Sequence, residues 1–256
     1  MLKIEKTVTM SPEQMLMIIE GMRNPLNSWG RIDSDITHIE NPKTLETGDY
    51  QFCLGEKDAE LMHRLSVGGS THAKYRRMMN VLVTLSAPLY WWKEFDTYKV
   101  GTVANSCSTM HKIAEKEFTL EDFSCEHLFC LGKNIGFDEL PIYNGERWDA
   151  EFVLEILIKS LNHYRSEFLE TKDKRYWWQM IQLLPSSYNQ KRTVQLNYEV
   201  LNRIFWDRCN HKLDEWHTFC DWIKTLPYMD IVCPLVQFTD TDEFLKKEEK
   251  LNGRHE

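Results

Sequence analysis

Residues 88–111, PLYWWKEFDTYKVGTVANSCSTMH, constrain the fold strongly because they join two segments of opposite character. The first segment carries Trp91, Trp92 and Phe95, and aromatic side chains at helical spacing usually pack into a core. The second offers hydroxyls, an amide, a thiol and a lysine around one glycine, and such groups can hydrogen-bond a small polyoxygenated ligand. The stretch predicts a helix over residues 88–98 followed by a polar loop. The aromatic segment fits a buried core helix and the floor of a binding site equally well.

The N-terminal third alternates strand and helix signals. Residues 1–10 alternate apolar and polar side chains, as a strand does. Ser11 followed by Pro12 predicts a helix start, because serine caps the end of a helix and proline suits its first position. Three further elements are expected: a turn-rich excursion at 24–48, a helix at 56–66 that ends before two glycines, and a long strand at 72–85.

The C-terminal half is expected to be mainly helical. Residues 148–170 place Phe152, Leu154, Leu157, Leu161 and Tyr164 near helical spacing, which predicts a long amphipathic helix. Shorter helices are expected at 176–184, 194–207 and 210–225, with a loop at 186–193. Since no internal repeat or linker interrupts the chain, we expect one α+β domain over residues 1–238 and a charged tail over residues 239–256.

Composition limits the possible partners. The 256 residues include 39 acids and 31 bases, and the resulting formal charge of −8 makes the chain a poor partner for nucleic acid. The first nine residues lack the apolar block of a signal peptide, and no apolar run is long enough to span a bilayer. Seven cysteines scattered along the chain suit a reducing compartment. We therefore expect a soluble cytoplasmic protein that is not associated with a membrane.

Two groups of cysteine and histidine residues raise the question of a metal site. One group lies in CEHLFC at 125–130 and the other at Cys209, His211, His217 and Cys220. Neither offers the closely spaced cysteine pair that feeds a structural zinc site. We expect buried thiols and hydrogen-bonded histidines here, and no metal. The GGSTH segment at 68–72 follows a helix and precedes a strand, the reverse of a phosphate-binding loop, and is expected to be a turn.

The polar segment resembles the signature of the flavin-dependent thymidylate synthases, Arg-His-Arg-x-x-Ser-x-Asn-Glu-x-Ser-x-Arg, which a Gln-Trp-Phe precedes. An ungapped overlay places Glu94 at the glutamine, Lys99 at the third position of Arg-His-Arg, and Thr102 and Cys107 at the two serines. Upstream, residues 68–89 are similar to the family's Gly-His-x-Ser strand. Downstream, residues 183–216 are similar to its Leu-Pro-x-Ser-x-Tyr-Thr, Asn-Leu-Arg and Leu-x-x-Arg segments, with Asn197 and Arg208 in place.

The resemblance implies an α+β fold with a mainly antiparallel sheet flanked by long helices, and an assembly of four identical subunits. It also implies methylation of dUMP to dTMP with FAD, NADPH and methylene-tetrahydrofolate. By this resemblance Arg208 is the catalytic residue and contacts the pyrimidine of the substrate. Implied cofactor contacts are Lys99, Thr102 and Asn197, and implied substrate contacts are Glu94, Cys107 and Arg208.

The departures from the signature concern charge. Three signature arginines are replaced, and only Lys99 keeps a cation. Arginine binds phosphate through two parallel hydrogen bonds, which lysine and threonine cannot reproduce. Arg76, Arg77 or Arg192 would have to substitute. Three functions stay open: a divergent flavin-dependent thymidylate synthase, a non-catalytic nucleotide-binding or nucleotide-sequestering homologue, and an assembly protein that keeps only the fold.

Overall fold

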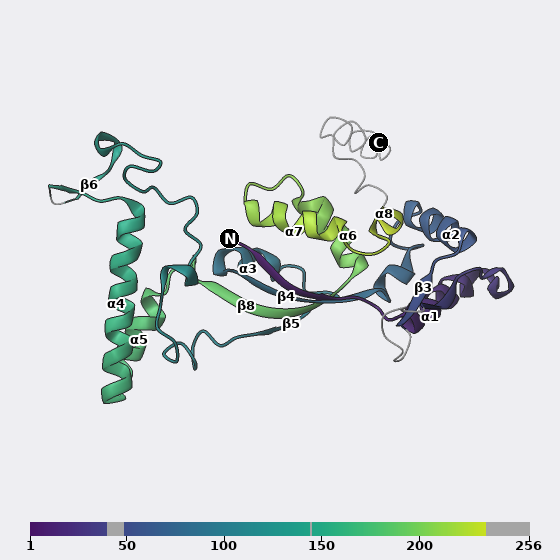
Figure 1. The fold of residues 1–256 in the computed structure, drawn as a ribbon, viewed down its shortest axis with the longest axis horizontal. Coiled ribbons are helices and arrows are strands. Elements are labelled where there is room, and N and C mark those ends of the chain that lie inside the picture. The colour runs from purple at the N-terminus through teal and green to yellow at the C-terminus, as the bar shows by residue number, and fades with distance from the viewer. Residues whose placement is uncertain (40–48, 144, 234–256) are drawn as a thin grey trace. The chain divides into compact units, whose positions relative to one another are not determined.

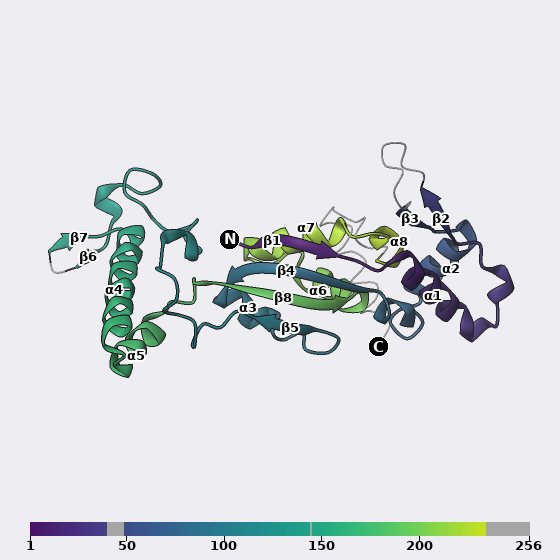
Figure 2. The ribbon, with the colours of Figure 1, turned by 60° about the horizontal axis from the view of Figure 1, so that its bottom comes forward.

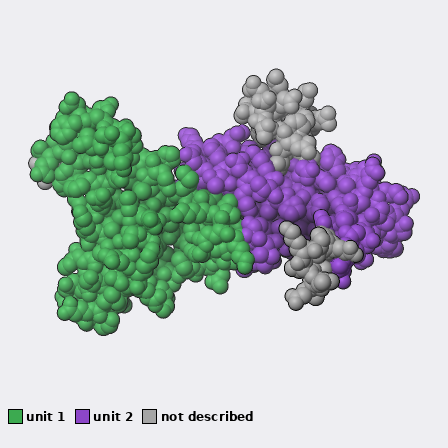
Figure 3. All heavy atoms as spheres, in the orientation of Figure 1, with its two compact units in different colours: residues 1–6, 83–99, 104–194 green, residues 7–82, 100–103, 195–256 purple. Residues whose placement is uncertain are grey.

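The computed structural model describes the chain except for residues 40–48, 144 and 234–256, so the expected tail at 239–256 lies outside the described residues. The described chain forms two compact units (Figure 3). The first unit contains Met1–Lys6, Val83–Lys99 and Ala104–Val194. The second contains the described residues of Thr7–Leu82, Val100–Val103 and Gln195–Cys233. That these units make up one domain stays a prediction.

Four strands form the largest sheet, in the order β1-β4-β8-β5 (Figures 1 and 2). They are β1 (Lys3–Val8), β4 (Asn80–Pro88), β8 (Asn189–Asn197) and β5 (Val103–Ser106). The predicted α+β class with an antiparallel sheet is confirmed. Burial alternates along β4, where Val81, Val83 and Leu85 are buried, because successive side chains of a strand point to opposite faces.

The second unit combines helices with a small hairpin. Its helices are α1 (Pro12–Arg23), α2 (Glu56–Val67), α6 (Tyr198–Arg208), α7 (Asp214–Lys224) and α8 (Met229–Val232). The hairpin consists of β2 (Asp35–Ile39) and β3 (Asp49–Cys53), which pair in antiparallel fashion. Short 3-10 helices cover Asn24–Leu26, Trp29–Arg31 and Lys74–Arg77. Helix α1 contacts the hairpin, and α6 contacts α7.

Helix α1 begins where the sequence predicts. The Ser11 hydroxyl accepts a hydrogen bond from the Gln14 amide at 3.3 Å, and the Gln14 side chain accepts one from the Ser11 amide at 2.9 Å. This reciprocal capping satisfies two amides that the helix itself cannot pair. Four apolar side chains of one face are buried, namely Met15, Ile18, Ile19 and Met22. Local chemistry therefore sets the start of the helix, and burial holds it in the second unit.

The first unit contains α3 (Leu89–Phe95), α4 (Ala150–Thr171), α5 (Lys174–Leu183), and the two-residue strands β6 (Ile142–Tyr143) and β7 (Glu146–Arg147). Helices α4 and α5 pack together (Figure 1). Their core contains Leu154, Ile158, Leu161 and Met180. The prediction of a long helix here is confirmed, but Phe152 is 42% exposed, so the buried stripe begins at Leu154.

Three element boundaries predicted from the sequence are wrong. The expected strand at 72–85 begins only at Asn80, because residues 74–77 form a 3-10 helix with Tyr75 buried. The expected loop at 186–193 and helix start at 194 give way to β8, which runs to Asn197. Helix α7 begins at Asp214 rather than at Asn210. The turn-rich excursion also contains β2, which the sequence did not predict.

No helix within the described ranges is both long enough and apolar enough to cross a membrane.

Candidate functional site

The aromatic segment that begins at Pro88 belongs to the core. Helix α3 buries Trp91, Trp92 and Phe95, each with at most 1% of its surface exposed. The indole Nε1 of Trp92 donates a hydrogen bond to the Gln190 carbonyl oxygen at 2.9 Å. Trp92 therefore anchors α3 to β8, and core packing is the correct interpretation of this segment.

Arg192 is held firmly beside this core. Its guanidinium lies 4.2 Å from the Trp92 ring centroid and donates hydrogen bonds to Asp96 Oδ1 at 2.7 Å and Gln190 Oε1 at 2.9 Å. Stacking and charge-assisted hydrogen bonds together fix the guanidinium in one orientation. Arg192 is thus engaged within the chain and does not replace a missing signature arginine.

The predicted residues Glu94, Lys99 and Cys107 belong to the first unit. Glu94 is half-buried in the last turn of α3, and Lys99 is exposed without an ion pair to any described residue. The Cys107 thiol is exposed. Its backbone is fixed, because its amide donates to the Lys191 carbonyl oxygen and its carbonyl accepts from Gln190 Nε2, both at 2.9 Å.

The remaining predicted residues, Thr102, Asn197 and Arg208, belong to the second unit. Asn197 ends β8 and caps α6, since its Oδ1 accepts a hydrogen bond from the Val200 amide at 3.0 Å. Gly101 lies against it with a φ of +82°, and a Cβ at Gly101 would come within 2.6 Å of Asn197 Nδ2. The structure therefore brings the loop before Thr102 onto the cap of α6.

The Thr102 hydroxyl is buried and has no hydrogen-bond partner among the described residues. A buried hydroxyl without a partner is costly for a folded protein and calls for an explanation, such as a ligand. Thr102 follows Gly101 in the sequence, and Gly101 lies against the Asn197 cap of α6. Nothing in the sequence distinguishes this threonine from its neighbours except the resemblance to the family signature.

Arg208 lies at the other end of α6. Eleven residues separate it from Asn197, which corresponds to about 16 Å along a helix. Its guanidinium lies over the Trp216 ring, 4.9 Å from the centroid. Within one chain the structure does not bring Arg208 to Asn197.

The charge beside the α6 cap is reversed relative to the family pattern. In Asn-Leu-Arg the arginine follows the asparagine by two positions, and this position holds Glu199. Arg76 lies opposite, with its Nη1 at 3.5 Å from Glu199 Oε2 and its Nη2 donating to the Ser66 carbonyl oxygen at 3.3 Å. Arg76 is 4% exposed, so its positive charge is buried beside a carboxylate, and its Nε has no hydrogen-bond partner among the described residues.

These residues do not fit a flavin dinucleotide. Its pyrophosphate needs cations with exposed donors, whereas Arg76 faces Glu199 and Arg192 is bound to Asp96. Asn197 is 9% exposed, its oxygen caps α6, and Gly101 covers its amide nitrogen. Glu199 adds a negative charge to the same helix end. The cap of α6 therefore keeps polar groups suited to a small ligand, while Arg76 and Arg192 are held by carboxylates of the chain; of the three substitute arginines, Arg77 alone is exposed and has no ion pair to a described residue.

The cysteine and histidine groups do not form a metal site among the described residues, where no three His, Cys, Asp or Glu side chains cluster in a suitable way. Cys220 is buried in α7, and burial raises the pKa of its thiol to about 12. A thiol with so high a pKa remains protonated near neutral pH.

The fold is shared with the flavin-dependent thymidylate synthases. Two crystal structures of such an enzyme, ThyX from Helicobacter pylori with FAD and dUMP, superimpose with a TM-score of 0.56 each. One is 15% identical in sequence, covering 91% of this chain and 96% of the other; the second is 14% identical, covering 92% and 98%. No protein-family model and no curated protein matches the sequence. The likeness therefore establishes the fold.

Proposed function

We propose that this protein binds a nucleoside monophosphate of the dUMP class on the thymidylate synthase scaffold and does not perform flavin chemistry. The observation that carries the proposal is the buried Thr102 hydroxyl, which lacks a partner among the described residues. It follows Gly101 at the cap of α6, in a fold whose solved relatives hold dUMP and FAD. A ligand hydroxyl or phosphate oxygen would satisfy this group.

The role of each predicted residue follows its chemistry. Lys99, an exposed cation, would face the phosphate, and Cys107 would line the nucleotide pocket. Arg208 lies at the far end of α6 from the Asn197 cap, so it would contact the pyrimidine from a neighbouring subunit, and Glu94 would contribute a further polar contact to it. We extend to this protein the homotetramer that the family resemblance implies, and we assign it to the cytoplasm because its cysteines suit a reducing compartment.

The test is binding of dUMP measured by thermal shift and calorimetry. We expect a melting temperature that rises with dUMP concentration, because a ligand that binds only the folded state stabilises it. Thr102→Val removes the hydroxyl and keeps the shape. It should leave the free protein as stable as the wild type or slightly more stable, and weaken dUMP binding about tenfold.

Two further variants test whether the effect is specific to the proposed site. Thr218→Val removes a hydroxyl that bonds within α7, to the Asp214 carbonyl oxygen, and should leave dUMP affinity unchanged. Arg208→Ala should abolish the dUMP response, and an unchanged response would show that the residue transfer from the family is wrong. A flat response across a panel of nucleotides would contradict nucleotide binding and favour the assembly role.

The second candidate is methylation of dUMP to dTMP with FAD, NADPH and methylene-tetrahydrofolate. The occurrence of Asn197 and Arg208 at the two ends of α6, in the family's order, favours it. Flavin absorbance distinguishes the two candidates. We expect the purified protein to be colourless and to bind no FAD on reconstitution, whereas stoichiometric FAD would overturn the first proposal in favour of the enzyme.

A further inference from the structure

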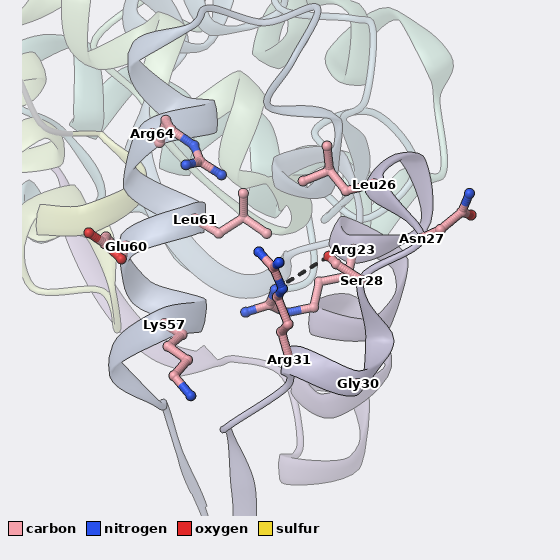
Figure 4. A pocket seen from close by; sticks show the side chains of 10 residues that line it. All are labelled: Arg23, Leu26, Asn27, Ser28, Gly30, Arg31, Lys57, Glu60, Leu61 and Arg64. Carbon is pink, nitrogen blue, oxygen red and sulfur yellow. Dashed lines mark hydrogen bonds between the residues drawn. The ribbon is translucent and has the colours of Figure 1, made fainter.

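A basic cavity lies within the second unit, between α2 and the segment from Arg23, at the end of α1, to Arg31 (Figure 4). Its volume is about 660 Å³, within the range of pockets that hold small molecules. Four of its lining residues are cationic, namely Arg23, Arg31, Lys57 and Arg64, and the only acidic one is Glu60. Arg23 is paired with Asp58, but Arg31, Lys57 and Arg64 still outnumber Glu60, and this local excess of positive charge in a chain with a net charge of −8 indicates an anionic ligand.

Arg23 is the fixed part of this cavity. Its side chain is buried, with 4% exposed, and its Nε donates to Asp58 Oδ1 at 2.5 Å. Its Nη1 lies 3.4 Å from the Ser28 hydroxyl, whereas its Nη2 is buried and has no hydrogen-bond partner among the described residues. Asp58 therefore sets the orientation of the guanidinium, and one donor of a buried cation remains unsatisfied at the cavity wall.

The other cations are not engaged within the described chain. The side chains of Arg31, Lys57 and Arg64 are exposed and form no ion pair or hydrogen bond with a described residue. Figure 4 shows Arg31 and Arg64 directed from opposite walls toward the middle of the cavity, where the Arg23 head group also lies. Glu60 points away from these guanidinium groups, so it does not neutralise them.

We propose that this cavity binds a small molecule through a chain of two or more phosphate groups. Arg23 is the buried anchor, and Arg31, Lys57 and Arg64 contact the outer phosphates. Guanidinium groups bind phosphate oxygens in pairs, and several separate cations match the charge of a polyphosphate better than that of one phosphate. The proposal does not depend on dUMP binding, because none of the six residues assigned to that function lines this cavity.

The test titrates tripolyphosphate, pyrophosphate and inorganic phosphate into the full-length protein at constant ionic strength, by calorimetry. We expect affinity to rise in the order phosphate, pyrophosphate, tripolyphosphate. The double variant Arg31→Glu with Arg64→Glu changes only exposed side chains and should weaken tripolyphosphate binding by about tenfold or more. Lys159→Glu reverses an exposed, unpaired charge on α4 and should change the affinity less than about twofold.

Arg23→Lys tests the anchor itself, since lysine keeps the charge beside Asp58 but loses the guanidinium fork. We expect weaker tripolyphosphate binding. If this variant fails to fold, the double variant decides.

Wild-type protein that does not bind tripolyphosphate, or a double variant that binds it as the wild type does, overturns the proposal. ATP that binds more tightly than tripolyphosphate identifies a nucleotide ligand, and equal affinity identifies recognition of the phosphate chain alone. A dUMP response that persists in the double variant separates this cavity from the function proposed above.

Discussion

Asp58 accepts hydrogen bonds from four donors within the second unit. Its Oδ2 accepts from the amides of Asp33 and Ser34 at 3.0 and 2.9 Å and from the Ser34 hydroxyl at 2.7 Å, while Oδ1 accepts from Arg23. Removing one member of such a buried pair leaves the other charge uncompensated. Asp58→Asn should therefore reduce the free energy of unfolding by about 3–5 kcal/mol, measured by urea unfolding. Asp207→Asn, at an exposed ion pair with Arg203, should cost less than about 1 kcal/mol. Equal losses in the two variants would contradict this account.

The same carboxylate should make stability depend on pH. Burial alone would raise the pKa of Asp58, but hydrogen bonds from Ser34, Arg23 and two backbone amides outweigh it and lower the pKa. Because the folded pKa lies below the unfolded value near 3.8, this contribution to stability is fully present above that value. It is lost as pH falls through the lower, folded pKa. Unfolding measured from pH 7 to pH 2 should show a smaller acid loss for Asp58→Asn than for the wild type, and parallel curves would contradict it.

Gly101 combines a backbone requirement with a steric one. Its φ of +82° disfavours any residue with a Cβ, and that Cβ would overlap the Asn197 amide. Gly101→Ala should cost about 2–4 kcal/mol of folding stability. Gly69 has a similar φ of +85°, but a Cβ built at Gly69 would meet no atom within 4 Å. Gly69→Ala should therefore cost only the backbone strain, about 1–2 kcal/mol. Chemical denaturation of both variants measures the difference, and equal losses would show that the contact with Asn197 contributes nothing.

At the scale of elements, the start of α6 depends on one side chain. Asn197 supplies the oxygen that accepts from the Val200 amide, and the helix has no other side-chain cap at this end. Asn197→Ala should reduce the free energy of unfolding by about 1 kcal/mol, whereas Asn197→Asp should retain the cap. Urea unfolding compares the two. An alanine variant as stable as the aspartate variant would show that the cap is dispensable.

Elements defined by local chemistry were predictable from the sequence. The Ser11 and Pro12 signal predicted α1, and the apolar spacing of residues 148–170 predicted α4. Elements that depend on distant partners were not. Residues 194–197 form a strand because β8 pairs with β4 and β5, although their sequence continues into a helix. Residues 74–77 leave the predicted strand because the Tyr75 hydroxyl donates to the Met62 carbonyl oxygen at 2.8 Å.

The candidate site was predictable only in part, for a similar reason. The resemblance to a signature could suggest Thr102 and Asn197, since it compares residue types along the chain. It could not show that Gly101 lies on the Asn197 amide, because 96 positions separate the two residues. The sequence also gave no sign of the basic cavity, whose cations are spread from Arg23 to Arg64 and gather only when α1 and α2 fold.

At the scale of the whole molecule, the proposed homotetramer is open to direct measurement. One chain has a mass of 30.5 kDa, so a tetramer has a mass of about 122 kDa, four times that value. We expect light scattering coupled to size exclusion to give this mass. A monomeric mass at micromolar concentration would contradict the assembly. A tetramer that dissociates in the Arg208→Ala variant would indicate that this residue serves assembly rather than ligand binding.

The order of strands in the largest sheet has a consequence during synthesis of the chain. Strand β8 lies between β4 and β5, yet more than eighty residues separate it from β5 along the chain. A ribosome that adds about 5–20 residues per second needs about 4–17 s to make that stretch. During this interval β4 lacks its neighbour, and its unpaired edge is open to association with other chains. The nascent protein should therefore depend on chaperones until residue 197 has left the ribosome, although the finished sheet has no such need.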